Sequence, residues 1–382
     1  MVRILAAISV LAAFAAAGET LVDVEGAGAG RTLVSIDVTG NPAFKASLRR
    51  NLELSGCFEV ARSGAVSVTG SVGGEIKVSG KGKVLTMASS AADDKSARME
   101  ARRLSDKMCE SLAGQKGFAC DRVAFVSREG KDVSELCVAY PDGFDIVRLT
   151  SDGKSAVGPR WKNRDTLFYT GIHNAGPQVF EYSIPASKRS LKWSFKGLTT
   201  GAAVSPDGNG VAIILSIHGN PELYVIDMAQ GSWKRLTNTK NASEGQPSWS
   251  PDGRSIVYVS DETRHPQLYV IDVATRARRR LTSTGSQNVD PDWGPDGRIA
   301  YITRRGGLGQ VAVLDPKVGD RSAQLVGKPG SWEHPSWSRD GRHLVAGRDK
   351  ALFVVDTAVE NPAEPKQLFR APGNWITPCW SK

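Results

Sequence analysis

The stretch Pro247-Ser-Trp-Ser-Pro-Asp-Gly-Arg254 recurs along this 382-residue chain. Near copies begin at Pro291 and Pro335, and shorter copies occur at three other places. The anchor residues of the copies are, in order, Trp161, Val204, Trp249, Trp293, Trp337 and Trp380. They are separated by 43, 45, 44, 44 and 43 residues. A near-constant period of this length, like that of WD40 repeats, predicts a β-propeller in which each repeat forms one blade.

Each repeat contains the same order of short strands. In the clearest repeat, residues 247–250 form the innermost strand of the blade, and Pro251-Asp-Gly253 forms a tight turn. Proline presets φ early in such a turn, the aspartate bonds the local backbone, and glycine accepts a positive φ. Strands follow at residues 255–260, 267–272 and 279–282. Four short strands per period are typical of one propeller blade.

The number of blades follows from the second strands, which begin near residues 122, 166, 210, 255, 298 and 343. The first of these has no innermost strand ahead of it, whereas residues 377–381 read as an innermost strand with no second strand after it. We therefore predict six blades and a ring that the C-terminal strand closes by completing the first blade. Closure would also remove exposed strand edges, which otherwise invite aggregation.

The chain ahead of the repeats divides into three segments. Residues 1–18 are typical of a cleaved secretory signal peptide, because Arg3 precedes a short apolar run that ends in small residues. Residues 19–31 are rich in glycine and are expected to be flexible. Residues 32–118 alternate strand and helix patterns, which predicts a small α/β domain. The six-bladed propeller then occupies residues 119–382, so the fold is mainly β.

Composition and charge exclude several classes of partner. After the signal peptide no apolar stretch is long enough to cross a bilayer, so we expect no direct membrane insertion. The formal charge is +9, but the basic residues are scattered, and the one dense run at residues 276–280 has no aromatic residues within it. We therefore predict no nucleic-acid partner, and we expect a monomer.

The cysteines bear on redox chemistry and on metals. Export would permit disulfides, and the odd number leaves at least one cysteine unpaired. There is no CxxC pair and no cluster at metal-ligand spacing, so we predict no zinc site and no cofactor. We interpret the cysteines as buried free thiols. They are Cys57, Cys109, Cys120, Cys137 and Cys379.

No motif for catalysis is found. The chain lacks a GxSxG elbow, an HExxH helix, a P-loop and an EF-hand loop. The repeated aspartates of the turns have a structural explanation, and we predict a binding protein that is not an enzyme. The alternative is a propeller hydrolase or lyase acting on envelope saccharides or peptides, which would need convergent acid and base groups in the channel. The five histidines have no paired cysteine and no metal-ligand spacing: His173, His218, His265, His334 and His343.

The tryptophans separate into two groups. Those at the repeat position are expected to pack between blades. Trp332 and Trp375 lie instead in loops just ahead of an innermost strand. They are candidates for exposed aromatic anchors of an interface, with burial in the core as the alternative.

The loops that lead into the innermost strands should all lie on one face of the propeller, which we name the loop face. Their composition is polar, with amides and acids, and binding residues usually collect on loops that a rigid scaffold positions. We therefore predict that function lies on this face and that the repeated motif belongs to the scaffold. The loops are residues 241–246, 285–290, 330–334 and 373–376.

With these features the chain resembles the TolB family of the Tol–Pal cell-envelope system. The motifs Trp-Ser-Pro-Asp-Gly-Arg-x-Ile and Gln-Leu-Tyr-Val-Ile-Asp look like TolB blades. The segment from Leu48 to Phe58 looks like the family's first helix with its Ser-Gly-x-Phe ending, and residues 103–127 look like its junction of second helix and first blade. Gly285-Ser-Gln-Asn288 resembles a TolB loop. An α/β domain ahead of the ring separates this family from other propellers.

The resemblance implies a periplasmic scaffold that links the peptidoglycan-associated lipoprotein Pal to inner-membrane TolA. The system supports outer-membrane integrity and constriction during cell division. Pal is expected to bind the loop face, and TolA the mature N-terminus. The candidate lipoprotein-binding residues are Ser243, Glu244, Gln246, Gln287, Asn288, Asp290, Trp332, Glu333, His334 and Trp375. The candidate TolA-binding residues are Glu19, Thr20, Leu21, Val22, Asp23 and Val24.

Overall fold

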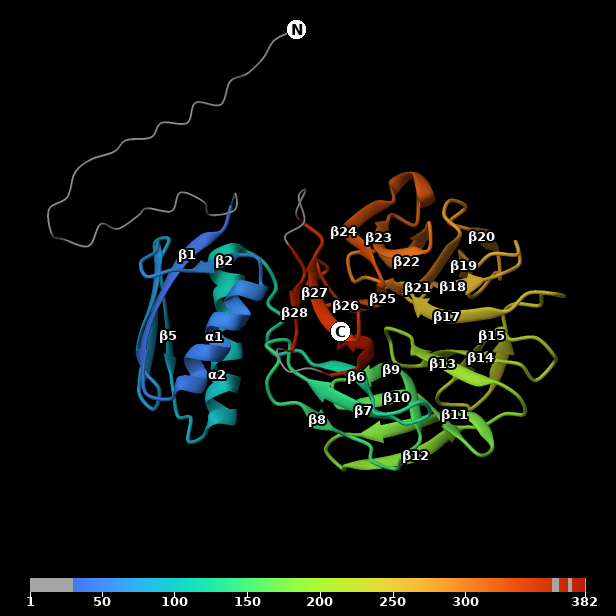
Figure 1. Ribbon diagram of the computed structural model, residues 1–382, viewed down its shortest axis with the longest axis horizontal. Helices are drawn as coiled ribbons and strands as arrows, with labels where there is room; N and C mark the ends of the chain where they lie inside the picture. Colours follow the sequence, from blue (N-terminus) through green and yellow to red (C-terminus); the bar gives the residue numbers. More distant parts are fainter. Residues whose placement is uncertain (1–29, 359–363, 370–372, 382) are drawn as a thin grey trace, which may run out of the picture.

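The computed structural model describes residues 30–358, 364–369 and 373–381 (Figure 1). The fold is mainly β, with a small α/β part near the N-terminus and a β-propeller-like arrangement of sheets after it. In Figure 1 the α/β part lies at the left, and its two helices lie between its sheet and the propeller. The predicted signal peptide, residues 1–18, and all but the last two residues of the predicted flexible segment 19–31 lie outside the described residues.

The α/β part is a five-stranded sheet covered by two helices. Its strand order is β2-β1-β3-β4-β5, with β1 parallel to both β2 and β3 and the last three strands antiparallel. Asn41 caps α1 just ahead of Pro42, and Asp93 forms a capping box with Ser96 at the start of α2. The elements are β1 (Thr32–Thr39), α1 (Pro42–Leu54), β2 (Phe58–Val60), β3 (Val66–Ser71), β4 (Glu75–Gly80), β5 (Lys83–Ala88), α2 (Asp94–Met108) and the π-helical turn η1 (Cys109–Ala113).

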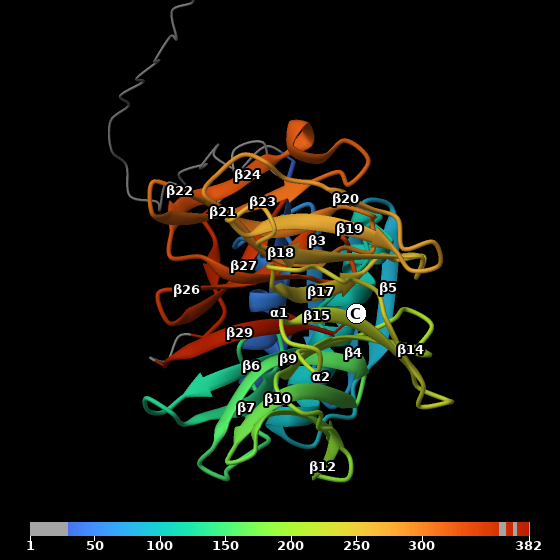
Figure 2. The ribbon, with the colours of Figure 1, turned by 90° about the vertical axis from the view of Figure 1, so that its right-hand side faces the viewer.

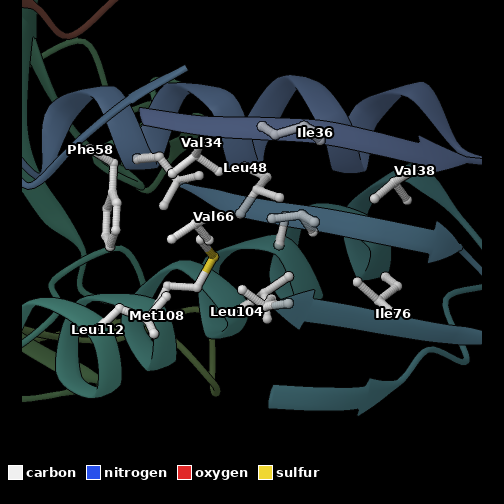
Figure 3. Close-up of a cluster of buried hydrophobic side chains, with 14 of the residues drawn as sticks. Val34, Ile36, Val38, Leu48, Phe58, Val66, Ile76, Leu104, Met108 and Leu112 are labelled. Carbon is white, nitrogen blue, oxygen red and sulfur yellow. The ribbon is translucent and has the colours of Figure 1, made fainter. Parts of the chain in front are cut away.

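Apolar residues alternate along the strands and recur at helical spacing along α1 and α2. Together they form one core for this part. Figure 3 shows strand residues such as Val34 and Val66 facing helix residues such as Leu48 and Met108. All four side chains are completely buried. The apolar stripe that the sequence shows on the second helix therefore packs against the sheet.

A buried ion pair fixes the α/β part against the propeller. The Arg102 side chain on α2 and the Asp142 side chain are both 0% exposed, and they are joined by two hydrogen bonds of 2.9 and 3.0 Å. Ser47 and Asn51 of α1 also donate to Asp142, at 2.6 and 3.2 Å. The Arg102 guanidinium lies 3.8 Å from the centre of the Tyr140 ring. Such a pair contributes little net stability, but its bidentate geometry permits few alternative orientations.

After the α/β part the described residues form short strands and turns. Four separate sheets contain four strands each, and one sheet contains eight. The eight-stranded sheet contains β6 (Val123–Arg128), β7 (Ser134–Ala139), β8 (Val147–Arg148), β9 (Ser155–Asn163), β10 (Thr166–His173), β11 (Gly176–Ser183), β12 (Lys188–Trp193) and β29 (Trp375–Trp380).

The four-stranded sheets follow one another along the chain and share one antiparallel order. The first two are β13 (Thr199–Val204), β14 (Gly210–Leu215), β15 (Glu222–Asp227), β16 (Trp233–Arg235) and β17 (Glu244–Trp249), β18 (Ser255–Ser260), β19 (Gln267–Asp272), β20 (Arg278–Arg280). The other two are β21 (Gln287–Trp293), β22 (Ile299–Arg305), β23 (Leu308–Leu314), β24 (Gln324–Gly330) and β25 (Glu333–Trp337), β26 (His343–Arg348), β27 (Ala351–Asp356), β28 (Lys366–Gln367). A 3-10 turn, η2 (Gly319–Ser322), precedes β24.

The last strand returns to the first strand of the propeller-like part. β29 pairs antiparallel with β6, with Trp375 opposite Ser127 and Trp380 opposite Val123. Figure 2 shows the two strands side by side.

Three of the five tryptophans at the repeat position bond to a neighbouring innermost strand, whereas the Trp293 indole donates to Gly297 of its own repeat at 3.0 Å. The indole N–H of Trp249 donates to the carbonyl of Ala203 at 2.9 Å, and that of Trp337 donates to Asp292 at 3.1 Å. The Trp161 indole makes the same bond with Cys379 of β29, at 3.0 Å. A buried indole N–H needs an acceptor, so each bond fixes one innermost strand against the one before it.

Among the residues that the structure describes, no helix is long and apolar enough to cross a membrane. All five cysteines are free thiols, and four of them are buried.

One copy of the repeat has glycine at position 294, directly after its anchor, where four of the other five copies have serine. The Ser250 hydroxyl donates to Asp252 at 2.6 Å and so supports the turn. A Cβ on Gly294 would lie 3.0 Å from the Trp337 indole nitrogen and 2.8 Å from the Asp296 carboxylate. The indole of the next blade therefore excludes a side chain at this position.

We predict that Gly294→Ser, although it restores the repeat, lowers the free energy of unfolding by about 1–3 kcal/mol through overpacking. Urea unfolding measures this. Gly245→Ser is the matched control, because a Cβ there meets no atom within 4 Å. A Gly294→Ser protein as stable as the unaltered protein would contradict the packing described here.

Candidate functional site: the loop face

Each innermost strand carries a β-bulge at the same repeat position. The residue three places ahead of the anchor has a left-handed backbone, and the ladder to the next strand shifts register there. Proline follows this residue in five of the six copies. A bulge tolerates proline because the ladder needs no N–H at that point. The bulge residues are Gly158, Gly201, Gln246, Asp290, His334 and Thr377, with φ between 47° and 72°.

Three of the bulge residues form a polar chain across neighbouring strands. The Gln246 amide donates to the Asp290 carboxylate and accepts from the Asp290 backbone N–H at 2.9 Å. The other oxygen of Asp290 accepts from the His334 backbone N–H at 3.1 Å. The His334 ring nitrogen Nδ1 lies 3.1 Å from Asp290 Oδ1. The predicted residues Gln246, Asp290 and His334 are therefore brought together, and Asp290 is the centre of the group.

Asp290 and His334 stabilise the charged form of each other. Burial alone would raise the pKa of Asp290, but the charge and N–H groups of His334 outweigh burial and lower it. Burial would lower the pKa of His334, but the charge and hydrogen bond of Asp290 outweigh that and raise it. Glu333 adds to the rise, and Arg160 opposes it. Asp290 is 8% exposed and the His334 side chain 28%, so only the histidine reaches solvent substantially.

A second row of bonds lies two residues further along the same strands. The Ser248 hydroxyl accepts from the Trp293 backbone N–H at 3.0 Å, and the Asp292 carboxylate accepts from the Trp337 N–H at 2.7 Å. Ser336 does the same for Trp380, at 3.1 Å. Side chains in this row stabilise the scaffold, because each accepts a hydrogen bond from a backbone N–H of the next innermost strand.

Sequence reasoning missed Arg160, which holds this same repeat position on β9. Its charge acts on both Asp290 and His334, which lie on other strands. The sequence could have indicated this position, because Arg160 directly precedes the anchor Trp161, just as Ser248 directly precedes the anchor Trp249.

Glu244 is buried, although we predicted it as part of the binding face. It is 4% exposed, and its carboxylate accepts from the Thr239 hydroxyl at 3.2 Å. The same hydroxyl lies 3.2 Å from the Glu222 carboxylate of the preceding sheet. Burial and the charge of Glu222 raise the pKa of Glu244 to about 7. Glu244 therefore holds its loop against the neighbouring sheet.

Asn288 has a similar structural role. Its amide donates to Gln267 at 2.8 Å and to the Thr284 carbonyl at 2.7 Å, and the side chain is buried. Ser243 and Gln287, in contrast, are exposed on their loops. Glu333 is half-buried, and burial raises the pKa of its carboxyl.

Trp332 and Trp375 are not exposed anchors of an interface. The alternative, burial in the core, is correct. Trp332 is completely buried, donates to the Lys328 carbonyl at 2.8 Å and meets the Phe353 ring edge-on at 5.8 Å. Trp375 is buried against Phe369, with ring centres 4.6 Å apart. Both indoles support the loops from beneath, so neither is an exposed anchor.

Within the described parts of the chain, no group of three or more His, Cys, Asp or Glu side chains is arranged to hold a metal ion. The predicted TolA-binding residues Glu19 to Val24 lie outside the described residues.

Comparison with known proteins places the chain among propellers of one type. A family model described as the TolB beta propeller domain matches residues 109–382. The Tol-Pal system protein TolB of Gluconobacter oxydans (strain 621H) is 26% identical over 149 residues, which is 38% of this chain and 33% of that relative. The match thus spans about a third of the relative's length.

Solved structures agree on the fold. The crystal structure of TolB from Acinetobacter baumannii matches with a TM-score of 0.78 and 22% identity, over 92% of this chain and 96% of that one. A chain of the nidogen/laminin complex matches with a TM-score of 0.56 and 11% identity, over 69% and 98% of the two chains. At these identities the likeness concerns the fold alone.

The first prediction from this site concerns Glu244. Its folded-state pKa is about 7, above the usual value of 4.5, so the folded state binds the proton more tightly and stability falls as pH rises from about 4.5 through 7. Glu244→Gln keeps an acceptor for Thr239 and removes this loss. We expect the variant to be about 1–3 kcal/mol more stable than the unaltered protein at pH 8 and equal to it at pH 4.

Urea unfolding at the two pH values measures the effect. Glu75→Gln is the control, since Glu75 is exposed and should change nothing at either pH. A Glu244→Gln variant that is destabilised equally at both pH values would refute the account of a carboxyl held largely protonated by burial.

The second prediction concerns Asp290 and His334. The raised pKa of His334 gives stability that is complete below about pH 6.5 and lost as pH rises through the folded pKa. The lowered pKa of Asp290 gives stability that is present above about pH 4 and lost as pH falls. The pair thus stabilises most between about pH 4 and the raised pKa of the histidine.

We expect Asp290→Asn to cost about 1–3 kcal/mol more at pH 5.5 than at pH 9, because the variant leaves His334 without its counter-charge. An NMR titration should show the His334 pKa falling in the variant. His265→Gln, at an exposed histidine, is the control. An unchanged His334 pKa would show that the two side chains are not coupled.

Proposed function

The chain belongs to the TolB β-propeller family, and we propose that it works as a periplasmic binding scaffold of the Tol–Pal system. In this proposal it links the lipoprotein Pal to TolA and supports outer-membrane integrity and constriction during division. The observation that carries it is the family match over residues 109–382. A cleaved signal peptide at residues 1–18 would deliver the chain to the periplasm.

We propose that the propeller has six blades and that β29 closes the ring. Contacts between innermost strands support this, because they run in a cycle from β9 through β13, β17, β21 and β25 to β29 and back to β9. The bonds on the two sides of β29 also match those between other blades, since it meets Ser336 on one side and Trp161 on the other. We keep the division at residues 32–118 and 119–382, which fits the absence of strand pairing between the two parts within the described residues.

The lipoprotein is proposed to bind the loop face through its accessible polar residues. Exposure and position favour Ser243, Gln287 and His334 as direct contacts, with Gln246 and Glu333 beside them. The buried members of the predicted set act indirectly, by holding the loops that carry these residues. These buried residues are Glu244, Asn288, Asp290, Trp332 and Trp375.

We propose further that the segment from Glu19 to Val24 binds TolA, as the resemblance implies. The action proposed for the whole protein is binding and not catalysis. The acid and base nearest to one another on the loop face, Asp290 and His334, are bonded to each other and to the backbone, which supports this.

Capture of the purified peptidoglycan-binding domain of Pal tests the proposal. Ser243→Arg and Gln287→Arg each place a bulky cation at an exposed loop residue, and we expect each to weaken capture at least about tenfold, roughly 1.4 kcal/mol, without loss of fold. Ser190→Arg and Gln230→Arg are matched controls at exposed positions away from the loop face, and they should capture normally.

Crosslinking in intact cells, with identification of the captured protein, supplies the second readout. Recovery of an outer-membrane lipoprotein supports the proposal. If both loop-face variants capture Pal as well as the controls do, the assignment of this face is wrong.

A further inference from the structure

Two cysteines far apart in sequence share one place in the α/β core. Cys57 lies between α1 and β2, and Cys109 opens the π-helical turn at the end of α2. Both belong to the same buried cluster, with exposures of 9% and 3%. Each cysteine is the largest influence on the pKa of the other, through a hydrogen bond between their side chains. The packing of α1 against α2 thus places the two side chains in one buried cluster.

Gln115 is hydrogen-bonded to both cysteines. The Cys57 thiol donates to its side-chain oxygen at 3.3 Å, and the backbone N–H of Gln115 donates to the Cys109 carbonyl at 3.1 Å. The π-helical turn between Cys109 and Gln115 is a wide turn of a kind that is frequent at functional sites.

A cation from the propeller lies beside Cys57. Arg342 donates to Gln115 at 2.7 Å and lies 3.8 Å from the Cys57 sulfur. Two bonds to Asp356, of 2.8 and 2.6 Å, fix the position of this guanidinium. The pair of cysteines therefore lies at the junction of the α/β part with the propeller.

The two thiols differ in acidity. The hydrogen bond from Cys109 lowers the pKa of Cys57, and the charge of Arg342 adds to this against the opposing effect of burial. The pairing with Cys57 and burial raise the pKa of Cys109. Cys57 is therefore the thiol that more readily becomes a thiolate, which is the nucleophile in disulfide exchange.

From this geometry we propose that Cys57 and Cys109 form a disulfide in the exported protein. The inference rests on the proposed function only for the oxidising compartment, where such bonds persist. The remaining cysteines stay reduced. They are Cys120, Cys137 and Cys379.

The oxidant is a disulfide of a protein or of glutathione. The Cys57 thiolate attacks one oxidant sulfur, forms a mixed disulfide and releases the other oxidant sulfur as a thiolate. Cys109 loses its proton and attacks the Cys57 sulfur, and the second oxidant sulfur leaves. The two cysteines lose two protons and two electrons, and the oxidant disulfide gains them as two thiols.

The bond would join α1 to the end of α2 across most of the α/β part. A cross-link that closes a long loop stabilises mainly by restricting the unfolded chain. It would also hold Gln115 in place for Arg342, and so stiffen the junction with the propeller.

The test is refolding of the mature chain in a buffer of oxidised and reduced glutathione. Remaining thiols are then blocked under denaturing conditions with N-ethylmaleimide and counted by mass spectrometry. We expect three of the five thiols to be alkylated and one linked peptide pair to contain Cys57 and Cys109. The melting temperature should rise by several degrees over that of the reduced protein.

Cys57→Ser and Cys109→Ser should each leave four alkylated thiols and abolish the thermal shift, whereas Cys137→Ser should keep both the link and the shift. Five alkylated thiols after refolding, or a link through any other cysteine, would overturn the inference. The experiment needs neither export nor a lipoprotein, so its failure is distinguishable from failure of Pal capture.

Discussion

The contact on which the propeller depends is the bond that Trp161, Trp249 and Trp337 each make to a carbonyl of a neighbouring innermost strand. An indole N–H without an acceptor is costly in a dry interior, so each bond fixes the distance and angle between two sheets. The bond from Trp161 to Cys379 matters most for closure, because it joins β9 to the last strand of the propeller, β29. The bulges then bring Gln246, Asp290 and His334 within reach of one another on neighbouring strands.

This arrangement separates residues that hold the loop face from residues that can meet a partner. Two carboxyl groups with shifted pKa values, Asp290 and Glu244, are buried and bonded to neighbouring strands or loops. Perturbation here reports a structural network, which is the common alternative to a functional site. The accessible residues are fewer and less conspicuous in sequence. The α/β part is fixed separately, by Arg102 and Asp142, so partners of the two parts would meet a scaffold of defined geometry.

Much of the fold could be predicted because the repeat specifies strands and turns locally. The period placed every anchor tryptophan, and the patterns of residues 32–118 predicted a sheet with helices, although not the short strand β2. Burial in the loops could not be predicted. Trp332 is buried because Phe353 of another strand covers it, and Glu244 is held through a threonine that also contacts Glu222 of the preceding sheet. These contacts are non-local, so polar composition alone suggested exposure. Arg160 was overlooked because the motif around Trp161 is incomplete.

The central claim is that β29 completes the ring, and the melting temperature of a chain that ends at Asn374 tests it most directly. Removal of the strand strips Trp375 and Trp380 from the core and frees the indole of Trp161 and the edge of β6. The account predicts a fall of about 10 °C or more relative to the full chain, since loss of each large core side chain alone costs several kcal/mol. A shortened chain that melts at the same temperature as the full chain would contradict it.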